Sequence, residues 1–297
     1  MSLIDHPHKT RPAVAPLTGL RLGAVELTVR DVTRSVAWYQ RALGLQLHSR
    51  GESSAVLGDG RETLVILDED PQARPAGHGT AGLYHYALLY PTREDLARAA
   101  VRLAATQTRI DGASDHGFHE AIYLPDPDGN GIELAADRAP ELWPAHGDAA
   151  AARPRPLDFS SLLDSVAGEP PPSVVAPGVR MGHVHLYVGD VSQAVAFYRD
   201  VLGFDLQSDY GVAAFLSVDG YHHHVAVNTW NGVGATAPPA HTAGLRQWTA
   251  TLPTDEDVEE LCDRLCAAKA EVRRFDGGLT TVDPFGTAVT FVAEETS

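Results

Sequence analysis

Hydrophobic and polar residues follow two different periods along this chain, and the change from one period to the other recurs. At 25–47, "VELTVRDVTRSVAWYQRALGLQL", alternating residues give way to a helical period that starts after an Asp and ends at Leu-Gly. Alternation is typical of a half-buried strand, and the longer period of an amphipathic helix. Asp is a preferred residue before a helix and Gly after one. The stretch therefore predicts a strand followed by a helix.

This pattern occurs four times. Residues 184–206, "VHLYVGDVSQAVAFYRDVLGFDL", align with 25–47 without a gap, and 82–105 and 244–268 share a variant with Pro-Thr before the helix. Short strand patterns follow each copy. Internal repeats decide an architecture before local motifs do, so we expect an α+β protein of four βαβββ modules. The modules lie near 20–70, 80–136, 180–232 and 243–294.

A Pro- and Ala-rich segment separates the second module from the third and is typical of a connector. The predicted organisation is a tail at 1–19, a first domain at 20–136, a connector at 137–179 and a second domain at 180–297.

Composition and charge narrow the function. The chain has 39 acidic and 23 basic residues and a net charge of -16, which argues against nucleic acid or an anionic membrane as partner. The sequence shows no secretion signal and no run of 18 apolar residues, so a cytoplasmic location is expected. Cys262 and Cys266 lie four residues apart in a predicted helix, where packed thiols are a better interpretation than a metal site.

The stretch 116–134, "HGFHEAIYLPDPDGNGIEL", holds the densest set of reactive side chains. Its Asp-Pro-Asp-Gly-Asn-Gly turn reverses the chain, so the strands carrying Tyr123 and Glu133 are expected to lie side by side. Strand alternation points Glu133 away from Ile132 and Leu134. A carboxylate among apolar neighbours needs a cation or a proton.

The repeats and this motif resemble the vicinal oxygen chelate superfamily, which groups glyoxalase I, bleomycin-resistance proteins and extradiol dioxygenases, and catechol 2,3-dioxygenase-like proteins in particular. The resemblance implies modules paired into two cupped half-barrels, with metal ligands from the first strands and a last strand. Ser114 departs from the extradiol signature. The matching residues are His116, Ile122, Tyr123, Asp126, Pro127, Gly129 and Glu133.

Carried over residue by residue, the resemblance implies a metal site of His85, Glu133 and His183, with His223, Tyr123 and His116 as catalytic residues. All six lie in the modules at 80–136 and 180–232. The aligned positions in the other two modules carry residues that cannot replace them: Gln247, Thr290, Ala24, Thr63, Thr280 and Arg273. In better-known extradiol enzymes the last two modules hold the site. We therefore expect modules two and three to pair within one chain, the alternative being a dimer that brings them together.

The implied activity is extradiol cleavage of a catechol-type aromatic diol with O₂, at a two-His, one-Glu site for Fe(II), with Mn(II) as an alternative. By resemblance, His223 assists oxygen activation and proton delivery, Tyr123 hydrogen-bonds the deprotonated substrate oxygen, and His116 orients Tyr123 or the substrate. A glyoxalase-like isomerase is the nearest rival, but it needs a second carboxylate that "HHHVAVNTW" at 222–230 does not supply. A metal-free bleomycin-resistance-like binding protein is the other alternative function. A homo-oligomer is left open.

Other residues receive weaker expectations. Strand alternation would place His222 and His224 opposite His223. His185 and Glu26 are also expected near the site, whereas a pocket or a core position is left open for Trp230, Trp248 and Tyr221. Loop or packing roles are expected for five residues: His78, His119, Trp143, His146 and His241.

Overall fold

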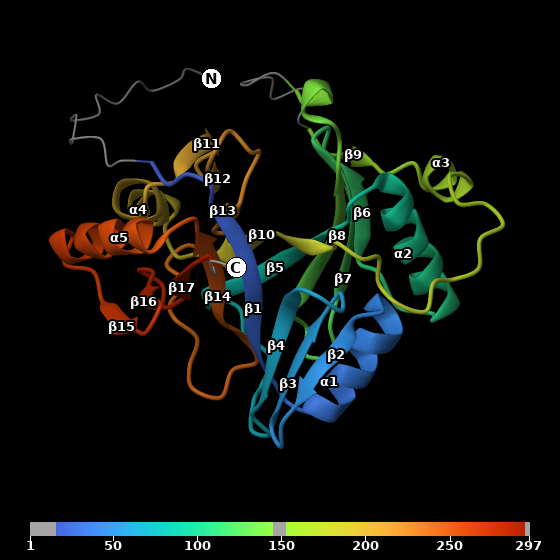
Figure 1. The fold of residues 1–297 in the computed structure, drawn as a ribbon, viewed down its shortest axis with the longest axis horizontal. Coiled ribbons are helices and arrows are strands. Elements are labelled where there is room, and N and C mark those ends of the chain that lie inside the picture. Colours follow the sequence, from blue (N-terminus) through green and yellow to red (C-terminus); the bar gives the residue numbers. More distant parts are fainter. Residues whose placement is uncertain (1–15, 145–152, 295–297) are drawn as a thin grey trace.

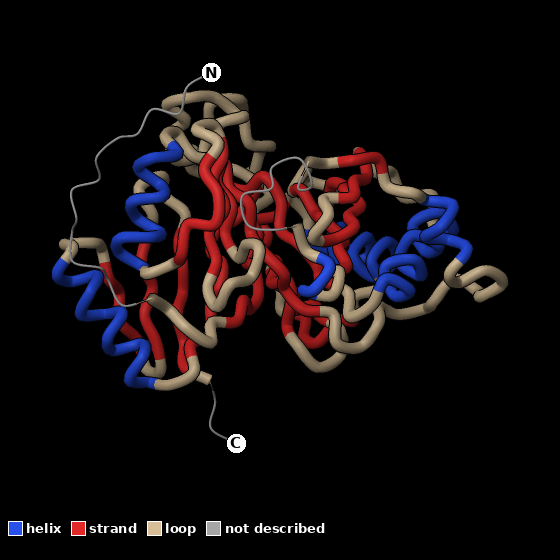
Figure 2. The backbone as a smooth tube through the Cα atoms, turned by 90° about the horizontal axis from the view of Figure 1, so that it is seen from above, coloured by secondary structure: helices blue, strands red, loops and turns tan. Residues whose placement is uncertain are grey.

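The computed structural model describes residues 16–144 and 153–294 and shows an α+β fold of two cupped sheets. Most of the predicted tail and His146 lie outside the described residues. In Figures 1 and 2 the strands fill the middle of the molecule and the helices lie along its outer sides.

The nine-stranded sheet combines modules two and three, in the order β11-β12-β13-β10-β5-β8-β7-β6-β9. Strands β10 and β5 pair antiparallel, and β5 and β8 pair parallel, so these three are neighbours. The strands of this sheet are β5 (Gly82–Leu89), β6 (Gly112–Asp115), β7 (His119–Pro125), β8 (Gly131–Asp137), β9 (Arg155–Pro156), β10 (Arg180–Tyr187), β11 (Asp205–Asp209), β12 (Ala213–Ser217) and β13 (Val225–Asn228).

The eight-stranded sheet combines modules one and four in the equivalent order, β15-β16-β17-β14-β1-β4-β3-β2. Its strands are β1 (Arg21–Val29), β2 (Gln46–Arg50), β3 (Ser54–Gly58), β4 (Thr63–Glu69), β14 (Gly244–Leu252), β15 (Val272–Phe275), β16 (Gly278–Val282) and β17 (Ala288–Ala293).

Each sheet therefore draws one module from each half of the sequence. The central strands β1 and β14 of one sheet contact β10 and β5 of the other. The division of the chain into domains at 20–136 and 180–297 stays a prediction.

The helices begin where the sequence pattern places them. The Asp31 side chain accepts a hydrogen bond from the Arg34 N–H at the start of α1, and Thr92 caps α2 in the same way. Gly44 follows the first module's helix with φ 73°, a left-handed conformation that favours glycine. The helices are α1 (Val32–Trp38), η1 (Tyr39–Leu43), α2 (Arg93–Ala105), η2 (Pro140–Leu142), α3 (Phe159–Asp164), α4 (Val191–Phe197), η3 (Tyr198–Leu202) and α5 (Asp255–Ala267).

Two buried tyrosine–aspartate contacts join modules that belong to different sheets. The Tyr39 hydroxyl of module one donates to Asp126 Oδ2 in module two at 3.1 Å, and Tyr198 of module three donates to Asp283 Oδ2 in module four at 3.1 Å. Both aspartates also accept backbone N–H groups of their own turns. The contacts therefore hold the turn before β8, and its counterpart before β17, in place.

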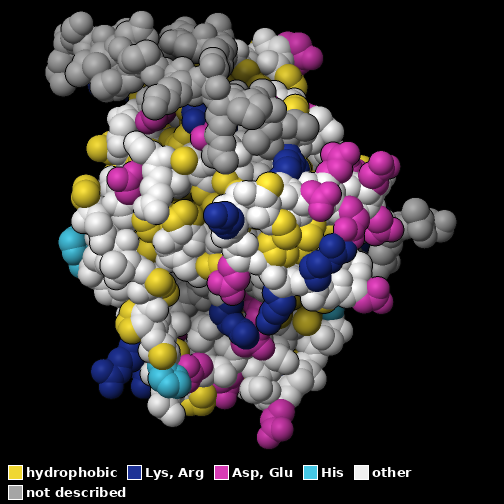
Figure 3. Space-filling view, turned by 90° about the vertical axis from the view of Figure 1, so that its left-hand side faces the viewer, with side chains coloured by type: hydrophobic (Ala, Val, Ile, Leu, Met, Phe, Trp, Pro, Cys, Tyr) yellow, Lys and Arg dark blue, Asp and Glu magenta, His cyan; other side chains and the backbone are white. Residues whose placement is uncertain are grey.

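The surface agrees with the acidic composition. On the face in Figure 3, which carries α4 and α5, Lys and Arg side chains are scattered among Asp and Glu side chains of the described residues. Within residues 16–144 and 153–294, no helix is long and apolar enough to cross a membrane.

Candidate metal centre

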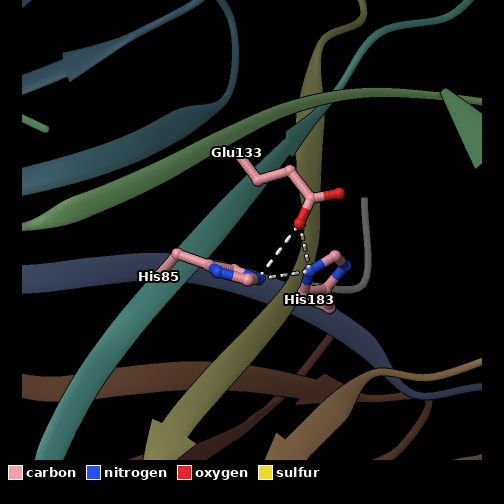
Figure 4. Close-up of side chains that lie close together, drawn as sticks. All are labelled: His85, Glu133 and His183. Atoms are coloured by element: carbon pink, nitrogen blue, oxygen red, sulfur yellow. Dashed lines mark hydrogen bonds and ion pairs between the residues drawn. The ribbon is translucent and has the colours of Figure 1, made fainter. Parts of the chain in front are cut away.

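Three neighbouring strands bring two imidazoles and one carboxylate to a single point (Figure 4). His85 comes from β5, Glu133 from β8 and His183 from β10. His85 Nε2 lies 3.0 Å from Glu133 Oε2 and 3.2 Å from His183 Nε2, and His183 Nε2 lies 3.2 Å from the same oxygen. The three residues are 6%, 1% and 2% exposed. All three predicted ligands therefore meet within one chain.

The spacing of these atoms fits one metal ion. Three ligands in adjacent positions around a six-coordinate ion lie about 3 Å apart when each is about 2.1 Å from the ion. Three such atoms on one side would leave the other side of the ion open. Gly131 helps β8 to reach this position, because a Cβ there would lie 2.0 Å from the Tyr84 carbonyl oxygen on β5.

Glu133 is the electrostatic centre of the cluster. Burial alone would raise the pKa of its carboxyl group, but the surrounding imidazoles, His183 foremost, hold that pKa well below its ordinary value. Burial lowers the pKa of His183. A deprotonated Glu and a neutral His are the forms that bind metals.

His119 belongs to this site, so the expectation of a loop or packing role was wrong. It lies on β7, is buried, and its Nε2 donates to Glu133 Oε1 at 2.8 Å. Oε1 is thereby occupied, and Oε2 is the oxygen that faces His85 and His183. Strand alternation from Tyr123 was the available signal, since residues 119, 121 and 123 share one face of β7.

Tyr123 and His116 lie together beside the cluster. The Tyr123 hydroxyl is 2.7 Å from His116 Nε2. Burial, aided by Glu133, raises the pKa of Tyr123, and burial lowers the pKa of His116 to about 4. Both side chains are therefore neutral at neutral pH, and a single proton is shared between the oxygen and the nitrogen.

His223 packs on His183 with ring centroids 4.1 Å apart. The expectation that strand alternation sets His222 opposite His223 was wrong, because β13 begins only at Val225 and the histidines precede it in an irregular segment. His222 Nδ1 instead lies 2.8 Å from His223 Nδ1, and His222 Nε2 lies 3.0 Å from Asp137 Oδ1. His222 also stacks on His119 with ring centroids 5.1 Å apart.

Aromatic and polar side chains surround this network. Tyr221 donates to Asp137 Oδ2 at 2.8 Å, and Trp143 packs on both Tyr221 and His222. Trp230 is largely exposed and contacts His185. Trp143 therefore has the packing role expected of it, whereas a place for Tyr221 or Trp230 in a substrate pocket stays a prediction.

The structure also places His224 and His185, the two remaining histidines expected near the site. His224 is buried, and its Nδ1 accepts the Val218 N–H at 3.3 Å. His185 lies against His85, with ring centroids 4.9 Å apart, and its Nε2 is 2.9 Å from Asn228 Nδ2.

The eight-stranded sheet has a hydrogen-bonded cluster of different side chains at the equivalent place. Thr290 bonds Thr280 at 2.9 Å and donates to Gln247 Oε1 at 3.1 Å, and Gln247 in turn donates to Glu26. The expectation that Glu26 lies near the metal site was wrong, because its carboxylate instead bonds Gln247 at 2.6 Å and Arg246 at 2.9 Å on β14 of this other sheet. Trp248 is also in this sheet, fully buried against Phe291.

The family model described as the Glyoxalase/Bleomycin resistance protein/Dioxygenase superfamily matches residues 21–134 and 180–291. The chain belongs to this superfamily. The resemblance inferred from the repeats and from 116–134 is thereby confirmed, as is the fold class.

Among known members, the chain is 36% identical over 277 residues to a protein of Bacillus subtilis (strain 168) named catechol-2,3-dioxygenase, across 91% of this chain and 96% of that protein. A solved structure from Bacillus subtilis subsp. subtilis str. 168 matches with a TM-score of 0.64 and 12% identity, over 97% of this chain and 87% of the other. Glyoxalase I from Zea mays matches with a TM-score of 0.57 and 18% identity, over 93% of this chain and 92% of the other. These two structures share the superfamily fold.

Proposed function

We propose that this superfamily member is an extradiol dioxygenase that cleaves a catechol-type aromatic diol with O₂ at a non-haem Fe(II) held by His85, Glu133 and His183, with Mn(II) as the alternative metal. The observation that carries the proposal is the triangle of two imidazole nitrogens and one carboxylate oxygen, 3.0–3.2 Å apart. The 36% identical catechol-2,3-dioxygenase supports it.

A metal ion held by His85, Glu133 and His183 would supply binding positions for both oxygens of a diol and for O₂. His119 orients the carboxylate by holding Oε1, so that a single Glu133 oxygen serves the ion. This arrangement preserves room for the substrate.

Tyr123 and His116 form the proton-handling pair for the substrate. The Tyr123 hydroxyl can donate to an oxygen of the diol while His116 Nε2, 2.7 Å away, holds the hydroxyl in position. Because burial lowers the pKa of His116 to about 4, this imidazole is neutral at neutral pH, and its Nε2–H group can donate to the Tyr123 oxygen while the hydroxyl donates to the diol.

Asp137 and His222 determine which nitrogen of His223 is free. Despite burial, the His222 hydrogen bond keeps the pKa of Asp137 low, so the deprotonated carboxylate accepts a hydrogen bond from the His222 Nε2–H group. The pKa of His222 is lowered by burial to about 4, which leaves its Nδ1 as an acceptor. His223 Nδ1 must then donate, and His223 Nε2 carries the lone pair. A proton acceptor is thereby prepared beside His183.

The rival functions have less support. A glyoxalase-like isomerase would use a second carboxylate at the ion, and among the described residues the triad contains only Glu133. A metal-free binding protein has no use for three metal-binding side chains buried together. The homo-oligomer and the cytoplasmic location stay predictions.

Metal loading followed by oxygen uptake tests the proposal. The full chain, reconstituted anaerobically with Fe(II), should bind one ion and consume one O₂ for each catechol converted to a yellow ring-opened product. His85→Ala should lower metal affinity by roughly 100-fold or more and abolish turnover. Gln247→Ala is the matched control, since Gln247 occupies the equivalent strand position in the other sheet. This variant should retain both metal affinity and turnover.

Two results would contradict the proposal. If the ion binds but neither Fe(II) nor Mn(II) supports oxygen uptake with any of a panel of diols, ring cleavage is wrong. If His85→Ala and Gln247→Ala reduce metal binding equally, the site is not the one described.

A further inference from the structure

A cavity of about 300 Å³ lies between α2 and the segment 172–177, which leads into β10. None of its lining residues belongs to the metal centre. Apolar side chains such as Leu43 and Val175 form most of its wall, and Tyr90 and Arg102 supply polar atoms. This size and composition are those of a small-ligand pocket.

Arg102 is buried in this wall without a counter-ion. It is 6% exposed, its Nη2 has no hydrogen-bond partner among the described residues, and burial lowers its pKa. Asp95, the acid that lines the same cavity, is bonded to Arg98 Nη1 at 2.8 Å. Arg98 itself also holds both oxygens of Glu169. Both nearby acids are therefore paired with Arg98, and no carboxylate of the described residues forms an ion pair with Arg102.

Tyr90 adds a second unused donor. It is 3% exposed, and its hydroxyl has no partner within the described part of the chain. Burial raises the pKa of Tyr90, so the hydroxyl keeps its proton at neutral pH. Two buried donors without a hydrogen-bond partner, Arg102 Nη2 and the Tyr90 hydroxyl, thus lie in the wall of the same cavity.

The guanidinium has little freedom to move elsewhere. A Cβ on Gly44 would lie 2.6 Å from Arg102 Cζ and 2.7 Å from Nη2, so the group lies directly against the Gly44 backbone. Keeping a buried cation unpaired is costly, and replacing it with an apolar residue of similar volume often stabilises a protein. Such a residue is expected where an anion completes the site.

We propose that this cavity binds a small organic monocarboxylate with an apolar body. A guanidinium without an ion-pair partner can bind one carboxylate, which is the planar anion that Arg binds with two hydrogen bonds. The Tyr90 hydroxyl can donate to the same carboxylate. The apolar wall suits a hydrocarbon body, which inorganic phosphate lacks.

Calorimetric titration of the full chain with benzoate, and with benzamide as its uncharged analogue, tests the proposal. Benzoate should bind at one site per chain and about tenfold or more tighter than benzamide. Arg102→Met should reduce benzoate affinity by about tenfold or more while its Tm stays the same or rises. Arg109→Met is the matched control, because Arg109 lies outside the cavity with its side chain 81% exposed, and it should leave the affinity unchanged.

A second variant covers the event that Arg102→Met does not fold. Ala99 lines the cavity, and Ala99→Leu should block benzoate by filling the space. The proposal is wrong if benzoate binds no better than benzamide, if either variant retains full affinity, or if His85→Ala removes binding, which would place benzoate at the metal centre. The proposed carboxylate site does not depend on the ring-cleavage activity.

Discussion

At the scale of single residues, the ligands explain only part of the site. His119 fixes one oxygen of Glu133, and Asp137 acts through His222 on His223. His119, Asp137 and His222 contribute no atom to the ligand triangle. They act instead on which Glu133 oxygen faces His85 and His183 and on which nitrogen of His223 carries the proton.

Asp137→Asn is predicted to reverse the proton positions in this chain of hydrogen bonds. Tyr221 would donate to the amide oxygen, so the amide NH₂ would donate to His222 Nε2. His222 Nδ1 would then carry a proton, and the lone pair of His223 would move from Nε2 to Nδ1. We expect kcat for ring cleavage to fall by roughly 10²–10⁴-fold with KM nearly unchanged. Long-range ¹H–¹⁵N spectra of the zinc-loaded protein should show the tautomer change directly.

Tyr221→Phe serves as the control for this prediction. It removes the other hydrogen bond of Asp137 but keeps the carboxylate, so the His223 tautomer should persist. A wild-type spectrum with the proton on His223 Nε2 would refute the hydrogen-bond chain.

At the scale of elements, the turn before β8 connects the fold to the metal centre. Asp126 accepts hydrogen bonds from two N–H groups of its own turn, from the Asn130 side chain and from Tyr39. Glu133 follows this turn by a few residues on β8. The orientation of the turn therefore affects the position of the carboxylate.

Asp126→Ala and Asp283→Ala are predicted to have similar effects on stability and different effects on metal binding. Each removes a buried acceptor of backbone and tyrosine donors, so each should lower the free energy of unfolding by about 2–4 kcal/mol. Only Asp126→Ala should also weaken metal binding, because Asp283 precedes β17 in the other sheet. Urea unfolding and metal titration of both variants measure this. Equal losses of metal affinity would refute a special role for the turn before β8.

At the scale of the whole molecule, buried neutral histidines couple stability to pH. Burial lowers the pKa of His222 to about 4 and of His224 to about 3. In the unfolded chain these groups titrate near 6.5, so below that pH the unfolded state binds protons that the folded state does not. Their stabilising contribution is present above about pH 6.5 and is lost as the pH falls toward 4.

The metal-free protein should therefore lose stability steeply between about pH 6.5 and 4. Each such histidine contributes up to about 1.4 kcal/mol per pH unit in this window. His224→Gln should make the slope shallower by up to that amount, since the amide oxygen can still accept the Val218 N–H without titrating. Urea unfolding at a series of pH values measures the slope. An identical slope in the variant would show that His224 does not titrate as inferred.

The sequence by itself determined the modules and their helices, and its resemblance to the superfamily supplied the six candidate site residues. The modules and helices depend on local interactions: strand and helix periods, caps such as Asp31, and the Asp-Pro-Asp-Gly-Asn-Gly turn. Strand alternation also indicated that His119 shares a face of β7 with Tyr123, and that Asp137 shares a face of β8 with Glu133. Each of these pairs is four residues apart.

Only the tertiary structure decided how the modules combine and what surrounds the ligands. The pairing of β10 with β5 joins residues about a hundred positions apart, and the irregular segment before β13 turns His222 toward Asp137. The isolation of Arg102 likewise depends on where Asp95 and Glu169 find their partners. Such outcomes follow from competition among contacts that are distant in sequence, and no local pattern records which contact forms.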